Sequence, residues 1–133
     1  MPGNKYLLDT HAFLWAVASP DQLSTVAREA IEDTDNMIVV SAASAWEIAT
    51  KWRIGTLPGA EVIVDGFSAH VSNLGAELLP ISADHALLGG TLDWGHRDPF
   101  DRMLAAQSRL ETCTLITADK TFNSLEGFRT AWN

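Results

Sequence analysis

Apolar positions along this chain of 133 residues fall into short continuous runs that alternate with stretches of helical periodicity. The runs at 6–8, 37–40 and 114–117 have the continuity of strands that are buried on both faces. Between them, apolar side chains recur every three or four positions, which predicts helices over 10–17, 23–33, 45–52 and 99–110. This alternation predicts an α/β fold, a three-layer α/β/α domain with a central parallel sheet.

Weaker signals complete the predicted order of elements. Residues 60–75 and 82–88 predict two further helices, and 129–132 predict a last strand. The run at 77–81 contains Pro80, which predicts an edge strand because proline cannot donate a hydrogen bond within a sheet. Glycines between 89 and 95 predict a loop. No repeat or linker interrupts the pattern, so residues 1–133 are predicted to form one domain.

Composition narrows the class of protein. No apolar run approaches the roughly 20 residues that a membrane-spanning helix needs, and the N-terminus has no secretory signature. Cys113 is the single cysteine, which excludes an internal disulfide and suits a reducing compartment. We therefore expect a cytoplasmic protein without a membrane partner.

The net charge of −8 is unfavourable for a protein that grips nucleic acid through a broad basic surface. The acids either keep the domain soluble or converge to hold divalent cations. Asp9 and Asp119 follow predicted strands, Glu47 lies in the helix after the second strand, and Asp98 and Asp101 open the helix at 99–110. Because ligands bind outside the carboxyl ends of parallel strands, we expect these acids to meet at one edge of the sheet.

Most of these acids also have a purely structural explanation. Glu47 and Ser44 have the spacing of a capping box, and Asp98 before a proline suits a helix N-cap. Asp101 would then lie in the first turn, where the helix dipole favours negative charge, and Asp119 suits the cap of a short turn. Asp9 is explained least well, because the neighbouring Thr10 is available as a cap and burial of a carboxylate beside a strand is costly.

A converging set of carboxylates is the ligand set for metal-assisted phosphodiester hydrolysis. Hard oxygen ligands suit Mg²⁺, with Mn²⁺ as a substitute. A metal lowers the pKa of bound water and stabilises charge on the attacking and leaving oxygens, so no serine, cysteine or histidine nucleophile is needed.

Four segments resemble the PIN-domain ribonucleases and, among them, the VapC-type toxins of bacterial toxin–antitoxin pairs; they are 6–15, 44–48, 97–107 and 115–119. The resemblance implies a magnesium-dependent endoribonuclease that cleaves RNA with a metal-activated water. It assigns the catalytic carboxylates to Asp9, Glu47, Asp101 and Asp119. Asp9 and Asp101 are the first metal ligands, and Glu47, Asp119 and Asp98 are further candidates, although a capping role is favoured for Asp98.

The resemblance also implies a cognate antitoxin that covers the acidic pocket, and a homodimer or larger assembly. His96, Arg97 and Thr117 are candidates for contact with the RNA substrate.

Other conspicuous side chains have more than one interpretation. Trp15 and Trp94 are candidates for base stacking or antitoxin contact, whereas core packing is favoured for Trp46 and Trp52. We expect Arg102 to pair with an acid, and Cys113 to be a small buried hydrophobe.

Two other functions compete with the toxin hypothesis. A housekeeping PIN-type RNA-processing nuclease would use the same fold and metal. A receiver-like signalling module would also bind magnesium, but it needs an aspartate at the end of the middle strand, where this chain has Ser41. A haloacid-dehalogenase-type phosphatase would need Asp-x-Asp after the first strand, and here Asp9 is followed by Thr10 and His11.

Overall fold

The computed structural model describes residues 3–133 and shows a parallel sheet of five strands in the order β3-β2-β1-β4-β5. The strands are β1 (Lys5–Leu8), β2 (Met37–Ser41), β3 (Glu77–Leu79), β4 (Thr114–Ile116) and β5 (Arg129–Ala131). From β1 the chain proceeds outward to β2 and β3, then returns to the other side of β1 to form β4 and β5. The topological switch point therefore lies between β1 and β4, where ligands bind in open sheets of this kind.

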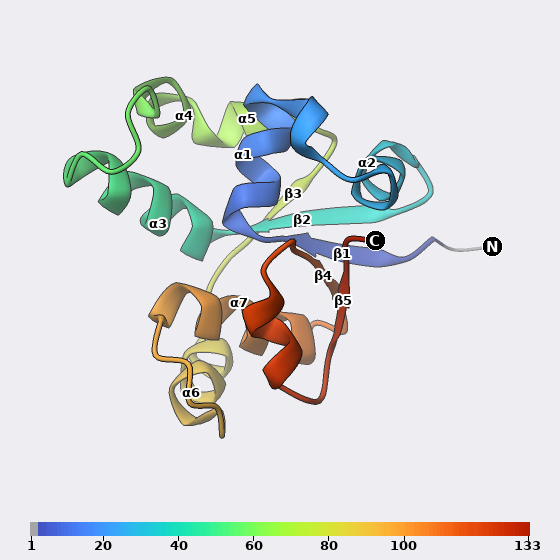
Figure 1. Cartoon of the computed structure of the whole chain (residues 1–133), viewed down its shortest axis with the longest axis vertical. Helices are drawn as coiled ribbons and strands as arrows, with labels where there is room; N and C mark the ends of the chain where they lie inside the picture. The colour runs from blue at the N-terminus through green and yellow to red at the C-terminus, as the bar shows by residue number, and fades with distance from the viewer. Residues whose placement is uncertain (1–2) are drawn as a thin grey trace.

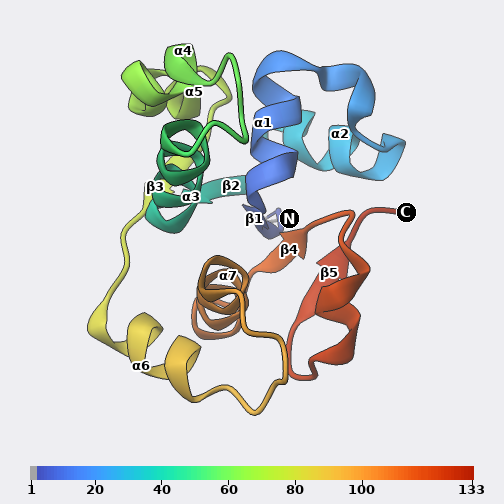
Figure 2. The same ribbon diagram turned by 60° about the vertical axis from the view of Figure 1, so that its left-hand side comes forward.

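Helices cover both faces of the sheet, as the sequence predicted (Figures 1 and 2). One face carries α1 (Thr10–Ala18), α2 (Thr25–Glu32), α4 (Glu61–Asp65) and α5 (Phe67–Asn73), and the other carries α6 (Ala83–Thr91) and α7 (Pro99–Leu110). The helix α3 (Ala42–Arg53) contacts both α1 and α7. Two short 3₁₀ helices, η1 (Pro20–Gln22) and η2 (Lys120–Ser124), complete the fold. Among residues 3–133, none of the helices has the length and apolar character to cross a membrane.

Two apolar layers explain the continuous hydrophobic runs of the strands. Leu7 on β1 pairs in register with Val39 and Leu115, and all three pack in the layer under α7. The next residue, Leu8, pairs with Val40 and packs in the layer under α1. Each central strand is thus apolar on both faces, and this is why alternation with polar residues is absent.

Two predicted boundaries were wrong for identifiable reasons. The helix predicted over 60–75 is divided at Gly66 into α4 and α5. The predicted loop at 89–95 begins later, because α6 continues through Gly89 and Gly90 to Thr91. Gly89 lies against α7, where a Cβ would be in ordinary van der Waals contact, 3.6 Å from the carbonyl oxygen of Arg102.

Core packing was the wrong prediction for two tryptophans. Trp46 and Trp52 are 57% and 43% exposed, respectively. Trp46 packs edge-on against Phe100 with ring centroids 4.6 Å apart, so the apolar contact lies at the surface between α3 and α7. Cys113, by contrast, is buried as predicted.

A buried polar network joins the sheet to α6 and α7. The Ser41 hydroxyl donates to Gln107 Oε1, and the Gln107 amide lies 3.3 Å from both the Pro80 carbonyl and His85 Nδ1. The backbone N–H of Ser82 also donates to His85 Nδ1, which assigns the ring proton to Nε2, 2.9 Å from Glu111 Oε2. The network satisfies polar groups that would be costly to bury alone.

We expect Ser41→Ala to lower the free energy of unfolding by about 2–3 kcal/mol. Ser41 caps α3 by accepting from the Ala43 N–H at 2.9 Å, and loss of a cap costs about 1 kcal/mol. The variant also leaves the buried Gln107 oxygen without its donor, which adds about 1–2 kcal/mol. Ser24→Ala is the control at the partly exposed cap of α2; it also removes a donor from the part-buried Trp132 carbonyl, which water can replace, and should cost about 1 kcal/mol. Urea denaturation measures both variants, and equal losses would contradict the role of the network.

Candidate metal and catalytic site

The four predicted catalytic carboxylates converge on one cavity of about 120 Å³ at the carboxyl ends of the central strands. The turn from β1 into α1 contributes Asp9, α3 contributes Glu47, the start of α7 contributes Asp101, and the segment after β4 contributes Asp119. The complete lining is Asp9, Thr10, His11, Glu47, Lys51, Asp98, Asp101 and Asp119. Five carboxylates therefore face a single lysine.

Asp9 is buried and its carboxylate is held by two donors. The backbone N–H of Ala12 donates to Oδ1 at 2.7 Å, and the Thr117 hydroxyl donates to Oδ2 at 2.5 Å. Asp9 is therefore the N-cap of α1, and the expectation that Thr10 would take that role is corrected. Burial raises the pKa of Asp9, while the two hydrogen bonds oppose the rise.

Glu47 is also buried and points into the cavity. The Thr10 hydroxyl donates to Glu47 Oε1 at 2.6 Å, and Lys51 Nζ lies 2.5 Å from Oε2. The predicted capping box between Ser44 and Glu47 does not form, because α3 begins at Ala42 and Ser41 caps it. Ser44 instead lies 3.0 Å from the Thr10 hydroxyl. A helix-capping role therefore does not explain the presence of Glu47.

Asp98 and Asp101 have different environments although they share a helical turn. The Asp98 carboxylate caps α7, accepting from the Phe100 N–H at 2.8 Å and from the Asp101 N–H at 3.3 Å. His96 Nε2 lies 2.7 Å from Asp101 Oδ2. Burial raises the pKa of Asp101 to about 6; the His96 hydrogen bond opposes the rise, and the charges of Asp98 and Glu47 add to it. The side chains of His96, Asp98 and Asp101 offer ligand atoms within 4.8 Å of one another.

Asp119 is the exposed member of the set. Its carboxylate caps η2 by accepting from the Thr121 N–H at 2.9 Å, and this bond lowers the pKa of Asp119. Its own N–H donates to the Thr117 hydroxyl at 3.0 Å. Thr117, a predicted substrate contact, thus links Asp9 to Asp119 and is itself buried. This geometry favours an orienting role for Thr117.

Arg102 does not pair with an acid, which corrects the sequence prediction. Its guanidinium donates to four backbone carbonyls between α6 and α7, at 2.7–2.9 Å; they belong to Gly89, Leu92, Trp94 and His96. These bonds fix the loop that carries His96, and the Trp94 ring packs 4.9 Å from the His96 ring. Arg102 therefore holds His96 beside Asp101. Arg97 is exposed and lines a separate hollow with Trp46.

Two site residues were missed by sequence reasoning. Lys51 follows Glu47 by four positions, a spacing that brings side chains together on a helix, so this signal was present. Thr10 was considered only as a cap, and its contact with Glu47 depends on how α1 lies against α3.

Comparison with known proteins identifies the family of this domain. The PIN domain family profile matches residues 6–127. Ribonuclease VapC16 of Mycobacterium tuberculosis is 41% identical over 59 residues, which are 44% of this chain and 40% of that protein. The chain thus aligns with less than half the length of this curated relative.

Three solved structures share the fold at low sequence identity. The VapBC2 complex of Rickettsia felis, bound to a DNA fragment from its promoter, has a TM-score of 0.72 at 17% identity, covering 97% of this chain and 99% of that one. A toxin–antitoxin complex from Klebsiella pneumoniae has a TM-score of 0.62 at 16% identity and 95% coverage of both chains. VapC20 of M. tuberculosis, a toxin that cleaves the sarcin–ricin loop, has a TM-score of 0.61 at 14% identity, covering 93% and 98%. Since the family profile spans most of the sequence and the fold agrees, this chain belongs to the PIN domain family.

Proposed function

We propose that this PIN-domain protein is a metal-dependent endoribonuclease and the toxin of a type II toxin–antitoxin pair. The observation that carries the proposal is the gathering of five carboxylates around one small cavity with a single opposing lysine. Like charges at this proximity repel one another unless a cation lies between them. Among the described residues that line the cavity there is no serine or cysteine, which supports hydrolysis by water over attack by a side-chain nucleophile.

The residues present fit a divalent metal. Asp9 and Asp101 supply the first two ligands, and Glu47 and Asp119 are further ones, whereas Asp98 serves as the N-cap of α7. The site already stabilises positive charge, since the Lys51 ammonium contacts Glu47 at 2.5 Å. Carboxylate oxygens suit Mg²⁺, with Mn²⁺ as a substitute. When bound, the metal supplies an activated water and stabilises negative charge on phosphate oxygens.

The protein's own contribution is to hold the carboxylates in place. Each buried carboxylate accepts from a donor on a neighbouring element: Asp9 from Thr117, and Glu47 from Thr10. A carboxylate has about four lone-pair sites, so these bonds leave acceptor capacity directed at the cavity. Groups held this way need little reorganisation when substrate binds.

The relatives support RNA as substrate and an antitoxin as partner. VapC16 is a ribonuclease and VapC20 is a toxin that cleaves the sarcin–ricin loop. Toxin–antitoxin assemblies have the same fold across nearly the whole chain. These likenesses favour the toxin over a housekeeping RNA-processing nuclease. Membership of the PIN family argues against the receiver-like signalling module and the phosphatase. We expect the toxin to form a homodimer or a larger assembly with its antitoxin.

Cleavage of single-stranded RNA by the purified protein should require Mg²⁺ or Mn²⁺ and stop when EDTA is added. Asp101→Asn should lower the cleavage rate by about 100-fold or more, because even partners that only orient a ligand contribute 10–100-fold. Asp98→Asn is the matched control and should retain most activity, since asparagine caps a helix as well as aspartate does. Full activity in excess EDTA would refute the mechanism. Equal loss in the two variants, with unchanged melting temperatures, would make Asp98 an essential ligand.

Metal affinity should fall as the pH is lowered through about 6. The pKa of Asp101 is raised to about 6, so this carboxylate takes up a proton there and ceases to be a ligand. Calorimetric titration with Mn²⁺ across this range should show the loss of affinity in the native protein and in Asp98→Asn. Asp101→Asn should bind more weakly throughout and lose affinity less steeply near pH 6, where only Asp9, whose pKa is also raised by burial, is left to take up a proton. A native protein whose affinity stays constant down to about pH 4.5 would contradict the assignment of Asp101, since an ordinary aspartate titrates near 3.9.

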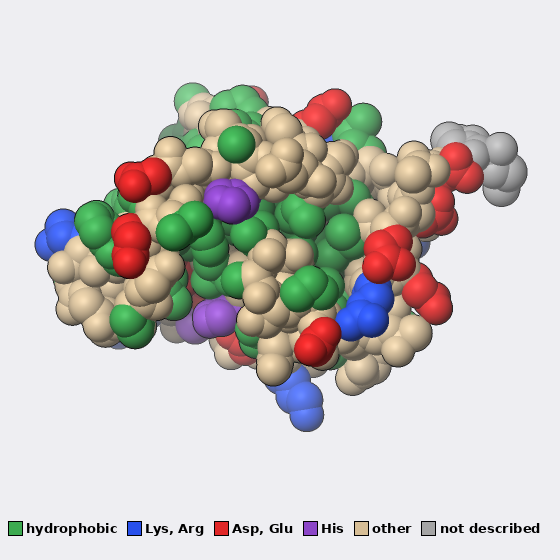
Figure 3. Space-filling model, turned by 90° about the horizontal axis from the view of Figure 1, so that it is seen from above, with side chains coloured by type: hydrophobic (Ala, Val, Ile, Leu, Met, Phe, Trp, Pro, Cys, Tyr) green, Lys and Arg blue, Asp and Glu red, His purple; other side chains and the backbone are tan. Residues whose placement is uncertain are grey.

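The antitoxin should insert a basic side chain among the carboxylates and compete with the metal. Charge pairs buried in this way contribute coupling on the order of 1.5–7 kcal/mol. Figure 3 shows apolar side chains gathered on the helical face seen from above, with acidic side chains around them, which suits a partner that combines apolar and basic groups. Calorimetry across a magnesium titration should show weaker antitoxin binding as magnesium rises, and weaker binding by Asp101→Asn. Affinity that changes with neither would show that inhibition does not act through the cavity.

A further inference from the structure

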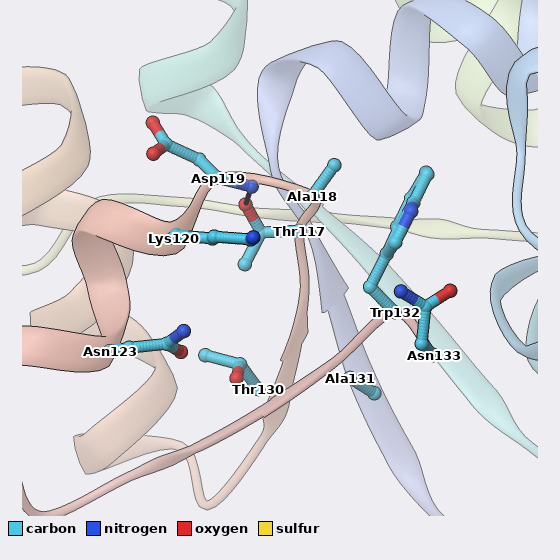
Figure 4. Close-up of a pocket in the computed structure, with 9 residues that line it drawn as sticks. All are labelled: Thr117, Ala118, Asp119, Lys120, Asn123, Thr130, Ala131, Trp132 and Asn133. Carbon is cyan, nitrogen blue, oxygen red and sulfur yellow. Dashed lines mark hydrogen bonds between the residues drawn. The ribbon is translucent and has the colours of Figure 1, made fainter.

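A second hollow, of about 220 Å³, borders the acidic cavity at the carboxyl ends of β4 and β5 (Figure 4). The two share Asp119, and Thr117 lies in the wall of the hollow while bonded to Asp9 of the cavity. A molecule bound in the hollow would therefore be a direct neighbour of one held at the carboxylates. The floor is formed by the ends of two strands, and η2 forms one side.

The polar groups of the hollow differ in chemistry from those of the acidic cavity. Lys120 contributes a cation, Asn123 an amide that both donates and accepts, and Thr130 a hydroxyl. In Figure 4 the Lys120 side chain extends from η2 toward Thr117, and the side chains of Asn123 and Thr130 face each other. These are groups that hydrogen-bond the sugar, the base edge and the phosphate of a nucleotide.

Lys120 stands out because most of the charge around it is negative. Lys51, the cation of the acidic cavity, is paired with Glu47 at 2.5 Å. Of the ion pairs formed within residues 3–133, none includes Lys120. Because it is not held in an ion pair, this ammonium is available to a phosphate beside the carboxylates, although the chain as a whole has a net charge of −8. Neutralisation of phosphates by lysine and arginine supplies much of the affinity for nucleic acid.

An aromatic wall leads from the hollow toward the acidic cavity. Trp132 lines the hollow, and its ring extends away from Asn123 and Thr130 (Figure 4) and packs partly against the core, with its centroid 5.6 Å from that of the Trp15 ring on α1. Trp15 in turn lines a neighbouring depression together with His11 and Asp9. Indole rings are favourable stacking surfaces for unpaired bases of any identity. The aromatic and polar walls thus occur together on one side of the carboxylates.

We infer that this hollow binds one nucleotide of single-stranded RNA adjacent to the phosphate that is cleaved, an inference that rests on the proposed function. Lys120 contacts the phosphate, Asn123 and Thr130 hydrogen-bond the base edge or the ribose 2′-hydroxyl, and Trp132 borders the nucleotide on the side nearer α1. The volume of about 220 Å³ is below the roughly 300–1,000 Å³ of pockets that enclose a whole drug-sized ligand, so the hollow would hold part of one nucleotide and leave the rest exposed. Asn123 then helps to determine which nucleotide lies beside the cut.

The test compares Lys120→Ala and Asn123→Ala with Arg129→Ala. Arg129 is an exposed cation at the amino end of β5 that does not line the hollow, so its removal changes the net charge as Lys120→Ala does and leaves the lining intact. Steady-state cleavage of a fluorogenic single-stranded RNA in Mg²⁺ should give a KM several-fold higher for both hollow variants, with kcat nearly unchanged. For Lys120→Ala the slope of log KM against log salt should fall by about 0.7, the value for one phosphate contact on a single strand. Asn123→Ala should also relax the nucleotide preference at the cut, and Arg129→Ala should match the native protein.

Two further measurements separate binding of RNA from the chemistry of the carboxylates. Calorimetric Mn²⁺ affinity should be unchanged in Lys120→Ala, which excludes damage to the adjacent Asp119. Fluorescence anisotropy in an Asp101→Asn background should show the same loss of RNA affinity without turnover.

The outcomes distinguish this inference from the proposed function. If both hollow variants behave like Arg129→Ala while the native protein cleaves RNA, the hollow is not a nucleotide site and the proposed function stands. If Lys120→Ala weakens the antitoxin complex and leaves RNA affinity unchanged, the hollow contacts the protein partner and the inference is wrong. A native protein that neither cleaves nor binds single-stranded RNA overturns both.

Discussion

Repulsion among buried carboxylates is the constraint on which the rest of this structure depends. Asp9 and Glu47 are nearly inaccessible to water, and burial, together with the charge of Glu47, raises the pKa of both Asp9 and Asp101. An isolated carboxylate in such surroundings would cost several kcal/mol. The protein meets this cost with donors aimed at each acid, from a helix N-terminus, two threonines, a histidine and a lysine.

The topology of the sheet makes this arrangement possible. The switch point between β1 and β4 brings the chain after both strands to one place, and the N–H of Asp9 donates to the Ile116 carbonyl at 3.0 Å. Thr117 then bonds to Asp9 within the same crevice. The apolar layers on both faces hold the strands in register, so the carboxylates are carried by rigid elements. The packing of the rest of the domain therefore holds the carboxylates together against their mutual repulsion.

The distribution of charge also reconciles an acidic protein with the nucleic-acid substrate that we propose. A metal at the carboxylates would reverse the sign of the local field and attract the phosphate that the bare site repels. The hollow beside it carries Lys120, an amide, a hydroxyl and an indole, so a bound strand would pass from the metal onto groups that suit a nucleotide. Affinity would then come from a few local contacts, with no need for a broad basic face.

The sequence by itself determined the layered parallel fold and the position of the acids along the chain. Strands that are buried on both faces must be continuously apolar. In helices that cover a sheet, apolar side chains recur every three or four residues, so both patterns are visible without tertiary information. Asp9 was recognisable because it directly follows such a strand, and Asp119 because it lies two residues beyond the run that ends at Thr117. The N-cap at Asp98 was also predictable, since the residue before a proline at a helix start has few alternatives.

Only the tertiary structure decided which partner each polar side chain has and which helix faces are covered. Glu47 accepts from Thr10 instead of forming a capping box, Arg102 donates to backbone carbonyls instead of an acid, and Trp46 lies at the surface. The cap at Asp9 likewise depends on how α1 leaves the sheet. In each case local spacing allows several partners, and the choice follows from the packing of α1, α3, α6 and α7 against one another. Contacts between residues distant in sequence are set by this packing, because a helix presents several faces and the chain pattern alone does not say which neighbour will cover them.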